Sequence, residues 1–200
     1  ITSPFTIGDL SSIDPKRPDL IRNAAAFGLP SDSFSTRVNL AITDVPSTGG
    51  TVDTRGFEGN VSISATITIA KPIKLILPDG IISGSVNPLI NITSGSGTEI
   101  VGAGIGATTL RQTGAGNGLN INIGSGSSLN LSLKDFTLDG QDAGAIGLNI
   151  HRIADSAIER VNVVGWLSNG VDSSNVANCL HNVVANCKFT AGVGAAKTAS

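Results

Sequence analysis

The chain has 200 residues, of which 40% are hydrophobic and 14% are charged. This length and apolar content suffice for one folded domain and exclude a disordered, highly charged tail. The formal net charge is −2, with 13 lysines and arginines. We therefore expect no nucleic-acid partner, because duplex binding depends on a basic surface that neutralises several phosphates. We also expect no membrane insertion, since no run of about 18 apolar residues occurs.

The sequence contains no Met, which predicts that its original start, and with it any secretion signal, is missing. Its two cysteines, Cys179 and Cys187, have no further Cys or His pair at the spacing of a zinc site. Both are expected to be small apolar core residues, with a disulfide between them as the alternative. The run Gly102–Gly106 is similar to a dinucleotide-binding loop, but no helix follows it. We therefore predict no cofactor and no metal.

Residues 1–45 contain the only helical signals and are predicted to form an N-terminal segment with a helical cap. One helix is expected over Asp19–Phe27, followed by a Gly-Leu-Pro stop. A second helix is expected from the N-cap residue Ser33 to Pro46. Its apolar residues share one face: Phe34, Val38, Ala41 or Ile42, and Val45. We expect this face to cover the open end of a β-solenoid, near Val52 and Ile67.

Residues 46–200 consist of short β-rich runs separated by Gly, Ser, Asn and Asp. The clearest runs alternate apolar and polar residues, so each has one buried face. These runs are Thr66–Ile69, Ile73–Leu77, Asn120–Ile123 and Leu129–Leu133. Two segments also recur along the chain. Gly118–Ile121 matches Gly147–Ile150 at an offset of 29 residues. Leu133–Gly140 matches Ile158–Gly165 at an offset of 25 residues.

Strand repeats of this length without intervening helices are typical of a coil with three short strands per turn. We therefore predict an all-β fold, a right-handed single-stranded parallel β-helix with a short N-terminal helical cap. Residues of the two repeats are expected to stack in its core: Leu133 with Ile158, Phe136 with Val161, and Leu138 with Val163. A third copy begins at Gly170, where either Leu180 or Val184 aligns with Ile158. The Leu180 alignment is the one we predict.

Several segments near the first strands carry a family resemblance. They are Gly49–Val52, Thr66–Ile69, Lys71–Leu75, Ile100–Gly104 and Thr108–Leu110. Over residues 33–189 the chain resembles the opening turns of the pectate-lyase (pectin-lyase-like) superfamily, which includes polysaccharide lyases, glycoside hydrolases and phage tailspikes. The resemblance implies an extracellular or virion-surface location and a polysaccharide or cell-surface glycan as partner, and it allows a homotrimer.

The resemblance concerns the fold rather than the chemistry. The chain lacks the Asn-Thr-Asp, Asp-Asp and Gly-His-Gly triplets of polygalacturonases. It also lacks a segment similar to the Arg-Ile-Lys motif of calcium pectate lyases. Any active site must therefore be sought among the residues themselves.

Charged residues of the two best-aligned repeats are predicted to lie next to each other. Lys134 aligns with Glu159, and Asp135 aligns with Arg160. We expect these residues to form two exposed cross-strand ion pairs, each stabilising the fold by a few tenths of a kcal/mol.

Three acids are candidates for catalysis on one face of the coil: Asp139, Asp142 and Glu159. Glycoside hydrolysis usually needs two carboxyl groups about 5 to 9.5 Å apart, one to protonate the leaving oxygen and one to attack or to activate water. Asp139 and Asp142 also suit a turn, because Asp hydrogen-bonds its own backbone there. Elimination from a uronic acid would instead need a base and a cation that neutralises the carboxylate.

Three residues are candidates for substrate binding: Trp166, Arg160 and His151. Trp166 is the only Trp in a chain without Tyr, and it would offer an aromatic face to a sugar ring. The alternative for Trp166 is a partly buried position at the rim of the coil. Arg160 and His151 would supply the groups that elimination chemistry requires, and the alternative for both is a solvated surface position.

Three functions remain open for a protein of this kind. The first is an extracellular or virion-surface protein, similar to a tailspike or fibre, that recognises a polysaccharide and could cleave it. The second is a polysaccharide lyase or glycoside hydrolase. The third is a purely structural or adhesive surface protein. The scarcity of His and Tyr favours the first and third functions, and we predict the first. The sequence also predicts that the β-helix is truncated at its C-terminus, since residues 192–200 show no capping helix.

Overall fold

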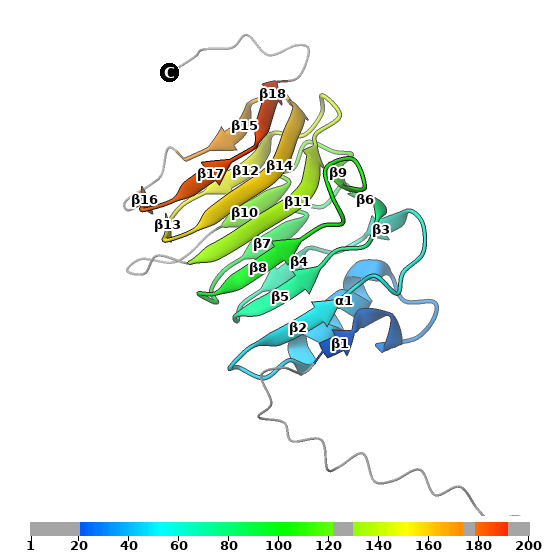
Figure 1. Cartoon of the computed structure of the whole chain (residues 1–200). Helices are drawn as coiled ribbons and strands as arrows, with labels where there is room; N and C mark the ends of the chain where they lie inside the picture. Colours follow the sequence, from blue (N-terminus) through cyan, green and yellow to red (C-terminus); the bar gives the residue numbers. More distant parts are fainter. Residues whose placement is uncertain (1–20, 122–129, 174–178, 192–200) are drawn as a thin grey trace, which may run out of the picture.

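The structure is a computed structural model that describes residues 21–121, 130–173 and 179–191. These residues form a parallel β-solenoid of about 6 turns with a single short α-helix at the N-terminal end (Figure 1). The predicted all-β fold with a helical cap is confirmed. Short strands follow one another because Gly, Ser, Asn and Asp interrupt each β-rich run after a few residues.

Within the described residues, parallel pairing organises the strands into three sheets. The eleven-stranded sheet contains β1 (Ile21–Asn23), β2 (Gly50–Asp53), β3 (Val61–Ile63), β5 (Ile73–Ile76), β6 (Gly80–Gly84), β8 (Thr98–Val101), β9 (Thr108–Gln112), β11 (Leu131–Asp139), β14 (Ala157–Trp166), β17 (Val183–Ala185) and β18 (Lys188–Ala191). The five-stranded sheet contains β4 (Ile67–Ile69), β7 (Ile90–Ile92), β10 (Leu119–Ile121), β12 (Ile146–Ile150) and β15 (Asn169–Asp172). The two-stranded sheet contains β13 (Ile153–Ala154) and β16 (Cys179–Leu180).

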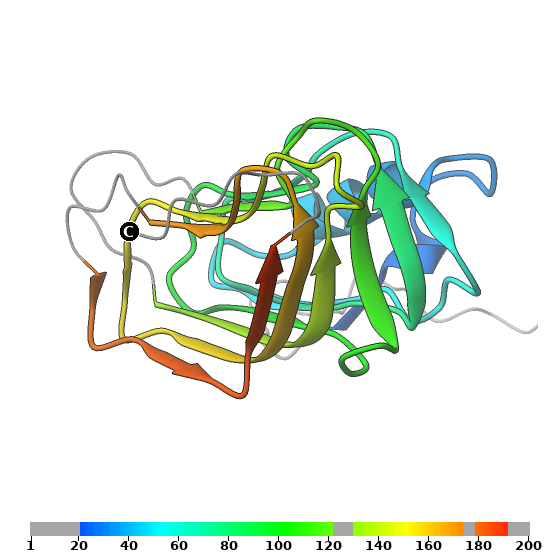
Figure 2. The same ribbon diagram turned by 90° about the horizontal axis from the view of Figure 1, so that it is seen from above.

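The eleven-stranded sheet forms two faces of the coil, because β11 and β14 each turn a corner. The corner residues Asp135 and Arg160 have left-handed φ angles of 61° and 51°. The first face consists of β2, β5, β8, β17 and the parts of β11 and β14 before the corner. The second face consists of β3, β6, β9, β18 and the parts after it. Figure 2 shows the same sharp corner between β17 and β18.

The core consists of inward side chains that stack from turn to turn. Leu133 pairs with Ile158, Phe136 with Val161, and Leu138 with Val163. All six side chains are buried. The predicted stacking at an offset of 25 residues is therefore confirmed, and it follows from the alternation of inward and outward residues along parallel strands in register.

Helix α1 (Phe34–Asp44) covers the first turn of the coil. Ser33 caps it by accepting a hydrogen bond from the Thr36 backbone N–H at 3.2 Å. The predicted apolar face is buried against the coil: Phe34, Val38, Ala41, Ile42 and Val45. Polar residues of the helix also satisfy the edges of the first strands. The Asn39 side chain donates to Thr66 O at 3.0 Å and accepts from Thr68 N at 3.1 Å. The predicted cap is confirmed.

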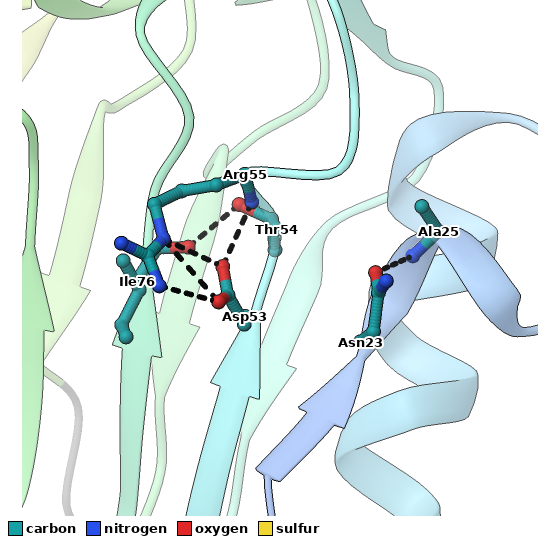
Figure 3. A network of polar contacts seen from close by, with 6 residues as sticks. All are labelled: Asn23, Ala25, Asp53, Thr54, Arg55 and Ile76. Carbon is teal, nitrogen blue, oxygen red and sulfur yellow. Dashed lines mark hydrogen bonds and ion pairs between the residues drawn. The ribbon is translucent and has the colours of Figure 1, made fainter.

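The predicted helix over Asp19–Phe27 is wrong over its described part. Ile21–Asn23 is strand β1, and Ala24–Ala26 is a single turn of 3₁₀ helix. Strand β1 pairs with β2 in parallel, so a long-range backbone ladder replaces local helical hydrogen bonds. The Asn23 side chain accepts a hydrogen bond from Ala25 N at 3.0 Å (Figure 3). This bond satisfies the first turn of a new helix and therefore separates it from the residues before.

The predicted alignment of Leu180 with Ile158 is also wrong. Val184 pairs with Ile158, and Leu180 pairs with Ala154 in the two-stranded sheet. The short strand β13 and the corner at Asp155, which has a φ of 51°, precede β14. The next turn repeats this arrangement before β17, so the offset is one residue longer than in the earlier repeat.

The structure describes only one of the two cysteine side chains. Cys187 is a free, half-buried thiol packed against the core, and its Sγ donates to Ile158 O at 3.4 Å. This position agrees with the predicted small apolar residue. The Cys179 side chain lies outside the described residues.

Candidate functional site

The corner between the first and second faces carries an Arg–Asp pair on its outer surface. Asp135 and Arg160 occupy the same position in successive turns. Arg160 Nε donates to Asp135 Oδ1 at 2.6 Å, and Nη2 donates to Oδ2 at 2.9 Å. These hydrogen bonds hold the pKa of Asp135 below its usual value. The predicted ion pair is confirmed, and it leaves Asp135 ionised at neutral pH.

A second charged cluster lies on the first face. Glu99 accepts from Lys74 Nζ and from Lys134 Nζ, each at 3.1 Å. Burial raises the pKa of Glu99, but the hydrogen bonds from the two lysines outweigh it and the pKa is lowered overall. Lys134 therefore pairs with Glu99 rather than with the predicted Glu159. The carboxylate of Glu159 instead lies 3.9 Å from Arg160 Nη1.

The start of the first face carries an exposed Arg–Asp pair of the same kind. Arg55 Nη2 contacts Asp53 Oδ2 at 2.7 Å, and Arg55 N donates to Asp53 Oδ1 at 2.9 Å (Figure 3). The Arg55 side chain thereby lowers the pKa of Asp53. The pair lies two turns away from the Asp135 corner along the coil, so it offers a matched reference for it.

The second face carries a row of uncharged polar residues that ends on a lysine. Thr109, Thr137, Asn162 and Lys188 occupy equivalent outward positions in four successive turns. We call these four residues the polar strip. Parallel strands place successive members about 4.8 Å apart. The strip therefore repeats hydrogen-bonding groups at a constant spacing along the coil.

Ion pairs border the polar strip on both sides. The Asp135–Arg160 pair lies at the corner, two residues before Thr137 and Asn162. Two residues after Thr137, Asp139 Oδ2 accepts from Arg111 Nε at 2.9 Å. Sequence reasoning did not single out Arg111, although its position two residues after Thr109 in an alternating run indicates an outward side chain.

The three predicted catalytic acids do not lie on one face. Asp139 and Asp142 come together at the turn after β11, where Asp139 Oδ1 accepts from Gln141 N at 3.0 Å and Asp142 N donates to Gly165 O at 2.7 Å. Glu159 lies before the corner at Arg160, on the first face. The structure thus brings two of the acids to one turn and separates the third from them.

The prediction that Trp166 presents an aromatic face to a ligand is wrong. Trp166 is completely buried, and its Nε1 donates to Leu138 O at 3.3 Å. A shift in register between Val164 and Trp166 turns the side chain inward after Gly165. The ring fills space left by four glycines, whose Cβ atoms would lie within 3 Å of it: Gly118, Gly140, Gly144 and Gly147. The clustering of glycines around the repeats is the sequence signal for this packing.

His151 lies away from the other predicted binding residue, Arg160. It directly follows β12 of the five-stranded sheet, and its backbone N–H donates to Ile121 O at 3.0 Å. Arg160 instead belongs to the eleven-stranded sheet. The two residues therefore do not form one binding group.

Two further searches concern metals and membranes. In the part of the chain that the structure describes, no group of three or more His, Cys, Asp or Glu side chains is placed to hold a metal ion. None of the described helices has the length and apolar composition of a membrane span.

Comparison with protein-family models, with curated proteins and with solved structures finds no significant match to this chain. The parallel β-solenoid therefore defines the class of protein by its fold. Membership of the pectate-lyase superfamily rests on the resemblance of its sequence segments alone.

Proposed function

We propose that this protein is an extracellular or virion-surface β-helix that recognises a polysaccharide through the polar strip and its flanking ion pairs. The observation that carries the proposal is the regular row of hydroxyl, amide and ammonium groups from Thr109 to Lys188. A polysaccharide also repeats its hydroxyl groups at a constant interval. A straight β-solenoid can therefore match several sugar units with equivalent contacts from successive turns.

The flanking arginines support this proposal because they have donors to spare. A guanidinium group has five N–H donors. Arg160 uses Nε and Nη2 on Asp135, whereas Nη1 lies 3.9 Å from Glu159, beyond the hydrogen-bonding distance of about 3.2 Å. The carboxylate holds the guanidinium in place, so less side-chain entropy is lost when a glycan oxygen binds.

The charge pairing favours recognition over turnover. A general acid needs a raised pKa and a proton to donate at the working pH. The pKa of Asp135 is lowered by Arg160, and Asp139 is bonded to Arg111. The proximity of Asp139 and Asp142 nevertheless makes a lyase or hydrolase the second candidate, with these two residues as its acids.

The proposal is tested by titrating the protein with a panel of acidic and neutral polysaccharides. We expect binding to at least one of them, and we expect Arg111→Gln to weaken that binding by about tenfold or more. The matched control is Arg55→Gln, which breaks an equally exposed Arg–Asp pair on the other face and should leave the affinity unchanged.

Other outcomes identify the other functions. Release of unsaturated or reducing ends during incubation would establish the lyase or hydrolase, and Asp139→Asn and Asp142→Asn should then abolish it. Failure to bind every polysaccharide would reject the proposal and leave a structural or adhesive rod. The burial of Trp166 already removes the aromatic platform that many sugar sites use, so binding must depend on polar contacts.

A further inference from the structure

The last described turn of the coil leaves core positions open to solvent. Val184 continues the column of Ile158, and Phe189 continues the column of Val163. The exposed fraction rises from 3% at Ile158 to 56% at Val184, and from 0% at Val163 to 49% at Phe189. These inward residues therefore lack a covering layer within the described part of the chain.

The open columns surround a hollow of about 430 Å³. Apolar side chains from both sides of the coil line most of it: Leu148, Ile150, Ile158, Val171, Val184 and Phe189. Exposed apolar surface of this kind marks an interaction site rather than a solvated surface. The hollow is the end of the core itself, so whatever covers it continues the core packing.

The opposite end of the coil shows what a cover must provide. There, α1 fills the core, while β1 and the side chains of Ser35 and Asn39 hydrogen-bond to strand edges. At the open end, β17 and β18 pair only with β14, and β15 pairs only with β12, among the described strands. The cover must therefore supply apolar groups together with backbone donors and acceptors, which a strand edge does.

We propose that the open end binds the open end of a second copy of this chain, around a two-fold axis that places β18 of each copy against β15 of the other. Both strands have four residues, and an antiparallel arrangement sets Phe189 opposite Val171 of the second copy. Inward residues then meet inward residues, so the two hollows close on each other. The capped end cannot take this role, because α1 already covers it.

Charge complementarity supports this choice of partner. The same antiparallel register sets Lys188, the first residue of β18, opposite Asp172, the last residue of β15, in the second copy. Two such opposite-charge pairs form, one on each side of the axis. Strand β17 carries no charged residue that would oppose the contact. An interface that uses the same surface on both copies closes as a dimer and does not grow further.

Sedimentation velocity of the full chain over a concentration series tests this proposal, which is independent of glycan binding. We expect a monomer–dimer equilibrium. Phe189→Asp should weaken the dimer by about a hundredfold or more, because it buries a charge at the centre of the interface. Leu40→Asp, a change at an exposed apolar residue of the capped end, should leave dimerisation unchanged. Trp166 fluorescence verifies that each variant is folded.

Reversal of charge tests the register directly. Lys188→Asp should weaken the dimer by about tenfold, because like charges then face each other. Combining it with Asp172→Lys should restore the dissociation constant to within about threefold of the original, as expected for a directly interacting pair. A chain that stays monomeric or forms trimers, a dimer that survives Phe189→Asp, or a double variant without recovery would each overturn the proposal.

Discussion

At the scale of single residues, alternation along a strand predicts which charged groups face outward, but not which of them pair. Asp135 and Arg160 occupy equivalent positions and do form their predicted ion pair. Lys134 and Glu159 are also equivalent, yet Lys134 reaches back one turn to Glu99. A lysine side chain has four flexible methylene groups, so several carboxylates compete for it. Only the positions of all the neighbours decide which carboxylate wins.

Glu99 is the first residue whose role can be measured. Replacing it with Gln removes two ion pairs and leaves two lysines without their shared carboxylate, so we expect the free energy of unfolding to fall by about 0.5–1 kcal/mol at neutral pH. Urea unfolding gives this value. Glu159→Gln is the control and should change it by a few tenths of a kcal/mol at most, because its nearest cationic nitrogen is 3.9 Å away.

The pH dependence provides a second measurement of Glu99. Its pKa is lowered in the folded protein, so its stabilisation is present above the unfolded value of about 4.3 and is lost as the pH falls through the folded value. The difference in stability between the original protein and Glu99→Gln should therefore disappear in acid. A difference that persists well below about pH 3 would contradict the ion-pair assignment.

Trp166 shows why a residue type alone did not predict its position. An isolated Trp in a polar turn is compatible with a glycan platform, but four glycines from neighbouring turns leave room for the indole inside the coil. These glycines are far apart in the sequence, from 118 to 147, and only the coil brings them together. The site residue was therefore predicted from local chemistry, whereas its burial depends on long-range packing.

Gly144→Ala tests the packing around Trp166. The added Cβ would lie 2.5 Å from Cζ3 of the indole, so we expect a loss of about 1–3 kcal/mol in the free energy of unfolding. The emission of this single Trp should also shift to the red as its packing loosens. Gly170→Ala is the control, since its Cβ would meet Val163 at an ordinary 3.5 Å. Equal effects of the two substitutions would refute the tight fit.

At the scale of elements, the second predicted helix was found and the first was not. Helix α1 has a capping Ser33, an apolar face and a terminating Pro46, all of which are local signals. Strand β1 has no such signal, because its residues also suit a helix and its conformation depends on pairing with β2. Local propensity is a weak guide wherever a distant strand offers an edge.

The cap itself can be tested by removing residues 1–45. This deletion removes β1 and α1, which uncovers the buried residues Val52, Ile63 and Ile67 and the strand edges that Asn39 satisfies. We expect the truncated protein to aggregate, because an apolar solenoid end with unpaired edges templates association. Light scattering during refolding measures this outcome. A soluble, monomeric deletion product would show that α1 does not protect the end.

At the scale of the whole molecule, self-similarity predicted the coil more reliably than any single strand did. The repeat at an offset of 25 residues placed six core residues correctly, because parallel strands in register repeat their inward positions. The next turn was misaligned because its extra residue lies in the turn near Asp155 and His181, and insertions there do not disturb the strands. The second face was only half predicted, since Asp139 and Arg160 were identified while Arg111 was not.

The coil as a whole predicts that the cost of a core truncation depends on its position along the axis. Leu75, Ile100, Leu133, Ile158 and Val184 form one inward column. Leu133→Ala leaves a cavity between two complete turns, so we expect the free energy of unfolding to fall by about 2–5 kcal/mol. Val184→Ala removes a side chain that is already 56% exposed, so we expect less than about 0.5 kcal/mol for the monomer. Urea unfolding at low protein concentration measures both values, and similar costs at the two positions would show that the last turn is covered in solution.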